Sequence, residues 1–280
     1  MEPGDAEPAW HREVISGEVA ATLAQLRDLR ALDAFYLAGG TGLALALGHR
    51  RSLDLDFFTP RPFEGDPLLG KIEHLPDFSL AMRDHETIHA AIAGVKVSFH
   101  GGRGPLHGCA APPACAHADL GAPRPQAGAA LRGGRAEFAS RGRAAPRNFA
   151  AFRAGFARRQ SGATPAIGYR YPLLFPTRPF MEVAVAQPRE IACMRISAIA
   201  SRGTKRDFVD LYFVAQTHGL RALFRHFAAK YAQTNYSPLH IAKSLTFFED
   251  AEKDPMPDML AVCDWAVVKQ YFSHEAPRLL

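Results

Sequence analysis

The sequence has few cysteines and no long hydrophobic run, and these absences exclude several classes of protein. Only 4 of its 280 residues are cysteine, which excludes a small secreted scaffold held together by disulfides. No apolar run approaches the roughly 20 residues that a membrane-spanning helix needs. The opening residues, MEPGDAEPAWHREV, lack the basic and apolar regions of a signal peptide. We therefore expect a reduced, soluble, cytoplasmic protein with no membrane partner.

Residues 100–166 contain no lysine and almost no acidic residues. These 67 residues hold 19 alanines, 11 glycines, 10 arginines and 7 prolines, with no lysine and only two acidic residues. Ten arginines against two acids give this segment a charge of +8, whereas the other residues, 23 basic against 26 acidic, sum to −3. Such a composition cannot bury a hydrophobic core. We expect a low-complexity, disordered insert within a folded protein.

Functional interpretations of this insert stay open. An Arg/Gly-rich arm could hold RNA through counterion release, with its phenylalanines stacking on bases. Its cysteines and histidines could bind zinc, although their spacing fits no common zinc motif; they are His107, Cys109, Cys115 and His117. Cys193 and Cys263 lie far apart in helical contexts, so we expect them to be buried apolar residues.

A strand, a glycine turn and a helix are predicted between residues 34 and 48. The apolar run AFYLA, residues 34–38, has strand length and ends at Gly39 and Gly40, which allow a tight turn and close backbone approach. The helix formers that follow make Thr41 a candidate N-cap. The N-terminus of a helix binds anions, so this turn is a candidate phosphate site.

Two aspartates follow in the sequence LDLDFF, residues 53–58. The two-residue period of a strand puts Asp54 and Asp56 on one face, opposite Leu53, Leu55 and Phe57. Paired carboxylates suit Mg²⁺, which prefers one or two carboxylates together with substrate phosphates. Two such ions would activate an attacking hydroxyl and hold a leaving pyrophosphate.

The chain resembles a known family at three places. Residues 36–58, YLAGGTGLALALGHRRSLDLDFF, look like the first motif of the AbiEii-type nucleotidyltransferases, toxins of type IV toxin–antitoxin systems. Residues 193–213, CMRISAIASRGTKRDFVDLYF, are similar to that family's second signature, and residues 244–260 resemble its C-terminal segment. The match spans residues 30–99 and 167–272 in the family's order.

The resemblance implies an α+β fold, with a polymerase-β-like nucleotidyltransferase mixed sheet and a helical C-terminal part. On this pattern residues 1–99 and 167–187 form the nucleotidyltransferase core, 100–166 the insert and 188–280 the helical domain. Family members transfer a nucleotide from a nucleoside triphosphate, in studied cases to the acceptor end of tRNA. The implied partners are therefore a nucleoside triphosphate, RNA (tRNA in particular) and an antitoxin, and the implied cofactor is Mg²⁺, with two ions expected.

The resemblance also assigns site residues. It gives Gly39, Gly40 and Thr41 as the phosphate-binding turn. Arg51, Ser52 and Lys96 are further candidates for binding the nucleotide, although Lys96 could instead be a solvated lysine. Asp54 and Asp56 are the expected metal ligands and catalytic carboxylates. The second signature adds catalytic-site residues Arg195, Lys205, Arg206, Asp207 and Asp210, together with Arg202. If one helix carried Arg202, Arg206 and Asp210, they would share a face at four-residue spacing, with the carboxylate orienting the cations.

Two departures from the family leave alternatives open. Arg195 stands where the family has lysine, which keeps the charge but changes its shape and reach. Ser98 stands where many nucleotidyltransferases have a third acid, which usually acts as the base. Without this acid, the metal-bound hydroxyl or another acid such as Glu182 would have to serve, or the chemistry would be impaired. The alternatives are a non-catalytic relative that binds nucleotide or antitoxin, an RNA-binding protein that acts through the insert, and a purely structural salt-bridge role for Arg206, Asp207 and Asp210.

Periodicity predicts the other elements. Besides the segments above, the N-terminal part should contain a helix at 12–29 and, after a polar loop, a hairpin at 86–99, with helices on one face of the sheet. A strand is expected at 180–186. Five helices should follow, at residues 189–201, 205–216, 220–232, 239–250 and 257–272. The active cleft should lie between the sheet that carries Asp54 and Asp56 and the helix that carries Arg206 and Asp210.

Overall fold

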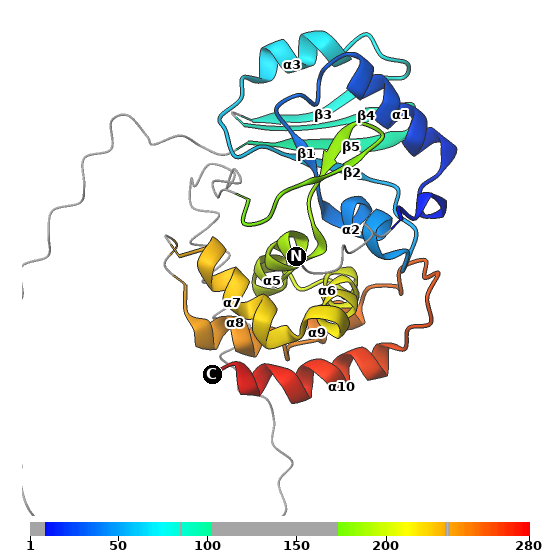
Figure 1. Ribbon diagram of the computed structural model, residues 1–280. Helices are drawn as coiled ribbons and strands as arrows, with labels where there is room; N and C mark the ends of the chain where they lie inside the picture. Colours follow the sequence, from blue (N-terminus) through cyan, green and yellow to red (C-terminus); the bar gives the residue numbers. More distant parts are fainter. Residues whose placement is uncertain (1–8, 85, 102–172, 233, 235) are drawn as a thin grey trace, which may run out of the picture.

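A mixed β-sheet, with helices packed on its upper side, lies above a bundle of helices (Figure 1). The computed structural model describes residues 9–84, 86–101, 173–232, 234 and 236–280. Nearly all of the predicted insert, its zinc candidates included, lies outside the described residues. Among the described residues, no helix has both the length and the apolar character needed to cross a membrane.

The sheet has seven strands in the order β3-β4-β5-β2-β1-β7-β6. Their bounds are β1 Tyr36–Leu37, β2 Leu55–Phe58, β3 Ser79–Asp84, β4 Thr87–Ile92, β5 Val95–His100, β6 Arg178–Phe180 and β7 Val183–Val185. The pairs β2 with β5 and β1 with β7 are parallel, while the other neighbours are antiparallel. The predicted α+β class with a mixed sheet is therefore confirmed.

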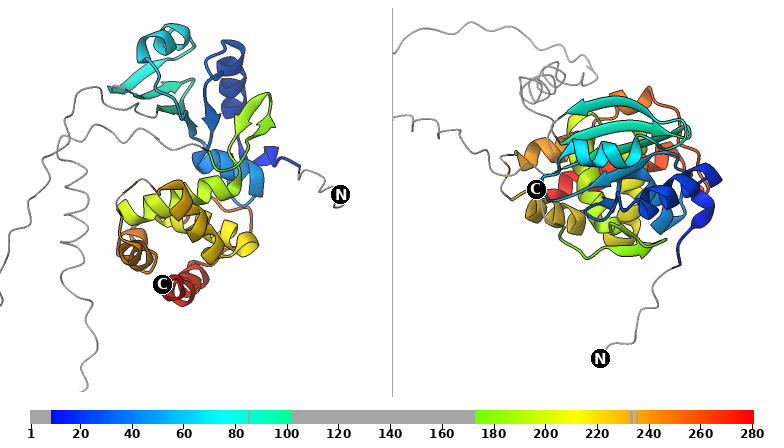
Figure 2. Two further views of the ribbon diagram at one scale, coloured as in Figure 1. Left: turned by 60° about the vertical axis from the view of Figure 1, so that its left-hand side comes forward. Right: turned by 90° about the horizontal axis from the view of Figure 1, so that it is seen from above.

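The two faces of the sheet differ in character. Helices α1 (Gly17–Asp28) and α3 (Gly65–Ile72) pack on one face, in a core that includes Leu55, Phe57 and Phe99. The view from above in Figure 2 shows α3 lying over the sheet. The opposite face carries the alternate residues of the same strands, and this is the face of Asp56.

The helical part is built on the long helix α5, which begins at Pro188, a favourable first helical residue. Its helices are α5 Pro188–Ser201, α6 Lys205–His218, α7 Leu220–Lys230, α8 Pro238–Ser244, α9 Glu249–Glu252, α10 Trp265–Glu275 and the 3₁₀ turn η2 Ala276–Leu279. They enclose a second core, which also takes Tyr36, Ala38 and Leu43 from the N-terminal part. Helix α2 (Gly39–Leu47) thus joins the sheet to the bundle.

Several predicted element boundaries were wrong. The helix expected at 12–29 is broken into a 3₁₀ turn, η1 (Arg12–Val14), and α1, because Ser16 accepts from the Val19 amide as N-cap. The single strand expected at 180–186 is a hairpin whose turn, Met181–Glu182, has positive φ. The helix expected at 239–250 is divided into α8 and α9, and the elements α3 and β3 were missed.

The last predicted helix also begins later than expected, at Trp265 rather than residue 257. The segment before it runs beside the loop after α2, where the amides of Leu260 and Ala261 donate to the His49 carbonyl. Asp264 then caps α10 by accepting from the Ala266 amide. Backbone hydrogen bonds to a distant loop replace the helical bonds that periodicity alone predicts.

Candidate active site

The site begins at the turn between β1 and α2. Gly39 has φ +59°, and a Cβ there would lie 2.3 Å from Oδ2 of Asp56. A Cβ on Gly40 would lie 2.5 Å from a guanidinium nitrogen of Arg50. Both positions therefore need glycine because charged side chains pack directly against the backbone.

Thr41 is not the N-cap that its position suggested. Helix α2 starts at Gly39 after Ala38, with no side-chain cap, and Thr41 is buried inside the first turn. Its hydroxyl donates to the Asp54 carbonyl and, as an acceptor, lies 2.8 Å from the hydroxyl oxygen of Ser52. Thr41 therefore ties the start of the helix to the segment that leads into the aspartate strand.

The two aspartates come from β2 and the residue immediately before it. Strand β2 begins at Leu55, so Leu53 and Asp54 precede the strand, and the side chain of Leu53 is exposed. Asp56 is partly buried beside Gly39, and the Asp54 carboxylate is 42% exposed. Both nonetheless face one cavity, as predicted.

A cavity of about 510 Å³ lies between the sheet and the helical part. It is lined by Gly40, Ser52, Asp54, Asp56, Arg195, Arg202, Thr204, Arg206, Asp207 and Asp254 to Pro257. Its walls come from α2, the aspartate strand and the junction of α5 with α6, so the cleft is where the sequence predicted it. Its fourth wall, residues 254–257, was not among the predicted site residues; the resemblance of residues 244–260 was the only signal for it.

The electrostatics of the two aspartates fit a divalent cation. Burial raises the pKa of Asp56, and the charge of Asp54 raises it further, while Arg195 acts in the opposite direction. A cation between the two carboxylates would relieve both effects. Among the described residues no group of three or more Asp, Glu, His and Cys could hold a metal ion.

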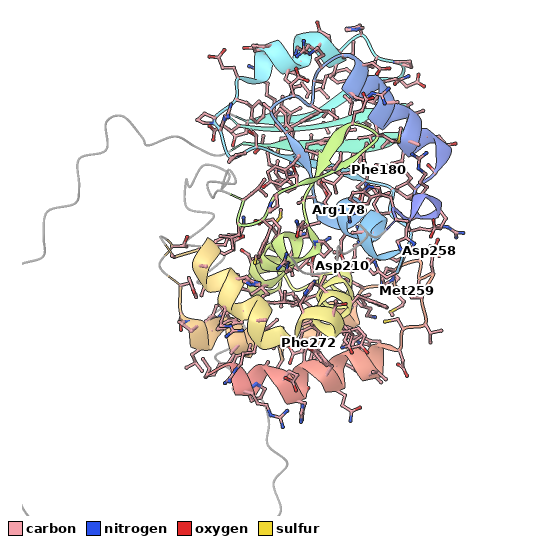
Figure 3. All side chains as sticks on the ribbon, viewed as in Figure 1. Arg178, Phe180, Asp210, Asp258, Met259 and Phe272 are labelled. Atoms are coloured by element: carbon pink, nitrogen blue, oxygen red, sulfur yellow. The ribbon has the colours of Figure 1, made fainter. Side chains whose placement is uncertain are left out.

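A buried charge network supports the cavity from behind. Asp210 is fully buried and accepts from Arg50 at 2.7 and 3.0 Å, with His49 Nε2 at 2.9 Å. Arg195 bridges Asp210 at 2.6 Å and Asp207 at 2.8 Å. Burial alone would raise the pKa of Asp210, but Arg195 and Arg50 hold it well below its usual range. Figure 3 shows Asp210 where α6 meets α2.

This network corrects the interpretation of the second signature. Asp210 does not orient Arg206 on a shared helix face, because its partners are His49, Arg50 and Arg195. Arg202 is not on α6 at all, since it is the C-cap of α5 and α6 begins at Lys205. The predicted spacing of Arg202 and Arg206 on one helix was therefore wrong, although both line the cavity.

The positively charged side chains of the second signature differ in whether they reach the cavity. Lys205 donates from Nζ to the Asp254 carbonyl at 2.6 Å and lies over the Trp265 ring. It does not line the cavity. Arg206 is 55% exposed and approaches the Asp54 carboxylate at 3.7 Å. Thr204 caps α6 in a reciprocal pair with Asp207, so Asp207 is structurally engaged even though it borders the cavity.

Other predicted residues lie outside the cavity. Arg51 is exposed and pairs with Asp258 at 3.2 Å, and Lys96 is exposed on β5. Glu182, considered as a replacement acid, lies in the β6–β7 turn with an 85% exposed side chain. Ser98 pairs in register with Asp56 on the neighbouring strand. Ser52 does line the cavity.

The profile of one protein family aligns with most of the chain. The family is described as nucleotidyl transferase AbiEii toxin, type IV toxin–antitoxin system, and the alignment covers residues 22–103 and 150–269. The chain belongs to this AbiEii family. The resemblance inferred from the motifs is thus confirmed, and the alignment is interrupted within the predicted insert, although it resumes at residue 150 rather than 167.

Relatives of this AbiEii nucleotidyltransferase include an uncharacterized protein from Aquifex aeolicus (strain VF5), 26% identical over 269 residues, covering 94% of this chain and 96% of that protein. Two solved structures are similar at 14% identity. JHP933 from Helicobacter pylori has a TM-score of 0.43, covering 95% of this chain and 93% of that one. The nucleotidyltransferase toxin MenT4 from Mycobacterium tuberculosis H37Rv has a TM-score of 0.44, covering 95% and 87%.

The close packing of Gly39 makes a first prediction for this AbiEii protein. Gly39→Ala should lower nucleotide transfer about 10²-fold, because a Cβ would displace the Asp56 carboxylate and small misplacements are this costly. Gly94→Ala is the matched control, since Gly94 also has positive φ but no atom near its Cβ position. Both variants should lose about 1–2 kcal/mol of unfolding free energy from backbone strain. Equal activity in the two variants would contradict this account of the turn.

Proposed function

We propose that this AbiEii nucleotidyltransferase acts in the cytoplasm and transfers a nucleotide from a nucleoside triphosphate to RNA, with Mg²⁺ as cofactor. A tRNA is the acceptor to test first. Membership of a type IV toxin–antitoxin family implies an antitoxin partner. The observation that supports the proposal is a cavity that joins two carboxylates, a helix N-terminus and two exposed arginines.

The triphosphate end of the substrate is expected to lie against α2 and the α5–α6 junction. Gly40 contributes the start of α2, where backbone amides attract phosphate. Arg202 and Arg206 line the same cavity with side chains 66% and 55% exposed, so their guanidinium groups can turn to phosphate oxygens. Arg195, in contrast, already contacts Asp207 and Asp210 and serves to position the cavity wall.

The metal ions would be held by Asp54 and Asp56. When bound, Mg²⁺ would supply charge neutralisation at the reacting phosphate and activation of the acceptor hydroxyl. The protein's own part is to keep both carboxylates in place: Thr41 holds the backbone carbonyl of Asp54, and Gly39 leaves room for Asp56.

The proposal is tested by incubating the purified protein with Mg²⁺, each α-labelled nucleoside triphosphate in turn, and total tRNA. Label in RNA is the expected result, and it also identifies the nucleotide. Nucleotide binding without any labelled product, from folded protein, would instead favour the non-catalytic alternative. Loss of RNA affinity on removal of residues 102–166, the part of the insert that lies outside the described residues, would show that this part holds the acceptor.

The exposed arginines of the cavity lead to a second prediction. Arg206→Ala should raise KM for the triphosphate about 10-fold or more, since a hydrogen bond to a charged group contributes about 1.5–3 kcal/mol. Arg51→Ala is the control, because Arg51 is an exposed arginine that pairs with Asp258 outside the cavity. A similar KM for both variants would mean that the triphosphate binds elsewhere.

A further inference from the structure

Three side chains form a row across the sheet on the face of the metal-binding carboxylates. Strands β2 and β5 pair Asp56 with Ser98, and strands β5 and β4 pair Ser98 with His89. Register partners project to the same face of a sheet. His89 Nδ1 lies 2.9 Å from Ser98 Oγ, so a hydroxyl and an imidazole in hydrogen-bond contact stand directly beside Asp56.

Ser98 and His89 continue the row from Asp56 toward the side of the sheet away from the triphosphate cavity. The cavity lies toward α2 and the α5–α6 junction, next to β1, whereas β5 flanks β2 on the other side. In phosphoryl transfer the attacking and leaving oxygens are roughly in line, on opposite sides of phosphorus. If Arg202 and Arg206 hold the pyrophosphate, the acceptor hydroxyl would arrive over β5, beside Ser98.

Neighbouring rings hold the imidazole of His89 in place. His100 lies 5.3 Å from His89, edge to face, and stacks on Phe58 at 4.9 Å. Burial, together with the proximity of His89, lowers the pKa of His100 to about 4, so His100 is neutral near pH 7 and places no positive charge against its neighbour. His89 and Ser98 are both partly buried, which leaves them access to a substrate hydroxyl and to solvent.

We propose that Ser98 and His89 take the place of the missing third carboxylate and carry the proton away from the acceptor hydroxyl. This inference rests on the proposed function. Ser98 Oγ, the catalytic group, accepts the hydroxyl proton while its own proton passes to His89 Nδ1. The acceptor oxygen bonds to the α-phosphorus, and the bond from phosphorus to the pyrophosphate oxygen breaks with its electron pair. His89 acts through Ser98 as a positioning residue and releases its extra proton to solvent.

The first test compares kcat for His89→Ala and Ser98→Ala with the wild type. Both should lower kcat about 10²–10⁴-fold, the range of general acid–base catalysis, with KM for the triphosphate unchanged. Binding of a triphosphate analogue with a non-cleavable α,β bond should also be unchanged, because Ser98 and His89 are not among the residues that line the cavity. His74→Ala, which removes an exposed histidine, is the control and should match the wild type.

Rescue separates this role from a merely structural one. Free imidazole should raise the kcat of His89→Ala at least 10-fold and leave the kcat of Ser98→Ala unchanged. Adding Ser98→Asp to His89→Ala should recover at least 10-fold of kcat and abolish the response to imidazole, since a carboxylate then accepts the proton directly. A folded Ser98→Ala or His89→Ala protein with kcat within 3-fold of wild type would overturn the inference, as would failure of both rescues.

The same experiment distinguishes this inference from the proposed function. Transfer by wild type that is lost in Asp56→Asn but kept in His89→Ala overturns the relay alone. No transfer by wild type from any triphosphate to any RNA overturns both.

Discussion

Asp56→Asn is expected to abolish nucleotide transfer, with a loss of at least about 10³-fold, in a protein that folds normally. Asp56 faces the cavity beside Asp54. Among the described residues, the other acids of the cavity wall are already engaged: Asp207 pairs with Thr204 and Arg195, and Asp254 accepts a hydrogen bond from the Lys205 amide. Neither can therefore replace Asp56. Labelled transfer to RNA measures the loss. Asp28→Asn, at an exposed surface pair with Arg27, should keep full activity, since such pairs contribute little.

The same substitution should not destabilise the metal-free protein. Burial raises the pKa of Asp56, so the folded state disfavours the ionised carboxylate at every pH above the pKa of an unfolded aspartate. Replacing the carboxylate with a neutral amide removes this unfavourable charge. Thermal unfolding at pH 7 should therefore give an Asp56→Asn melting temperature at or above that of the wild type. A clearly lower value, or retained transfer, would contradict the assignment of Asp56 as a metal ligand.

Asp210→Asn is expected to lower the unfolding free energy by about 3–5 kcal/mol, because it leaves buried arginines without their carboxylate. Arg50 and Arg195 both donate to Asp210, and all three side chains are at least nine-tenths buried. Urea unfolding, read as a lower midpoint at unchanged slope, measures the loss. Asp258→Asn, at an exposed pair with Arg51, should lose less than about 1 kcal/mol. A loss that small for Asp210→Asn would contradict the network.

The pH dependence of this loss follows from the direction of the Asp210 shift. Burial alone would raise the pKa, but Arg195 and Arg50 lower it below the usual range. A lowered pKa gives stabilisation that is fully present above the unfolded value, about 3.9, and is lost as the pH falls toward the folded value. The difference in stability between wild type and Asp210→Asn should hold from pH 7 to pH 5 and shrink below about pH 4. A constant difference at all pH values would exclude a charge effect.

The local part of the site was predictable from the sequence because its geometry is local. A strand, two glycines, a helix and a second strand bring Gly40, Asp54 and Asp56 into one cavity within 17 consecutive residues. The period of the strand also predicted the shared direction of the two carboxylates, even though Asp54 precedes β2. Fold class and family followed from the same motifs.

The partners of the second signature were not predictable, because they come from distant segments. Four-residue spacing suggested that Asp210 would orient Arg206, but Arg50, 160 positions earlier, binds Asp210 instead. Sequence spacing likewise could not show that Lys205 is held by Asp254. Helical periodicity predicts which residues share a face, but it does not predict which distant charge is buried against that face.

The most direct test of the central claim is a crystal structure with Mg²⁺ and a triphosphate analogue that has a non-cleavable α,β bond. The account predicts metal density at Asp54 and Asp56, and phosphates against the start of α2 with Arg202 and Arg206 turned toward them. Triphosphate bound away from this cavity, for example on the exposed Arg51 or Lys96, would contradict it.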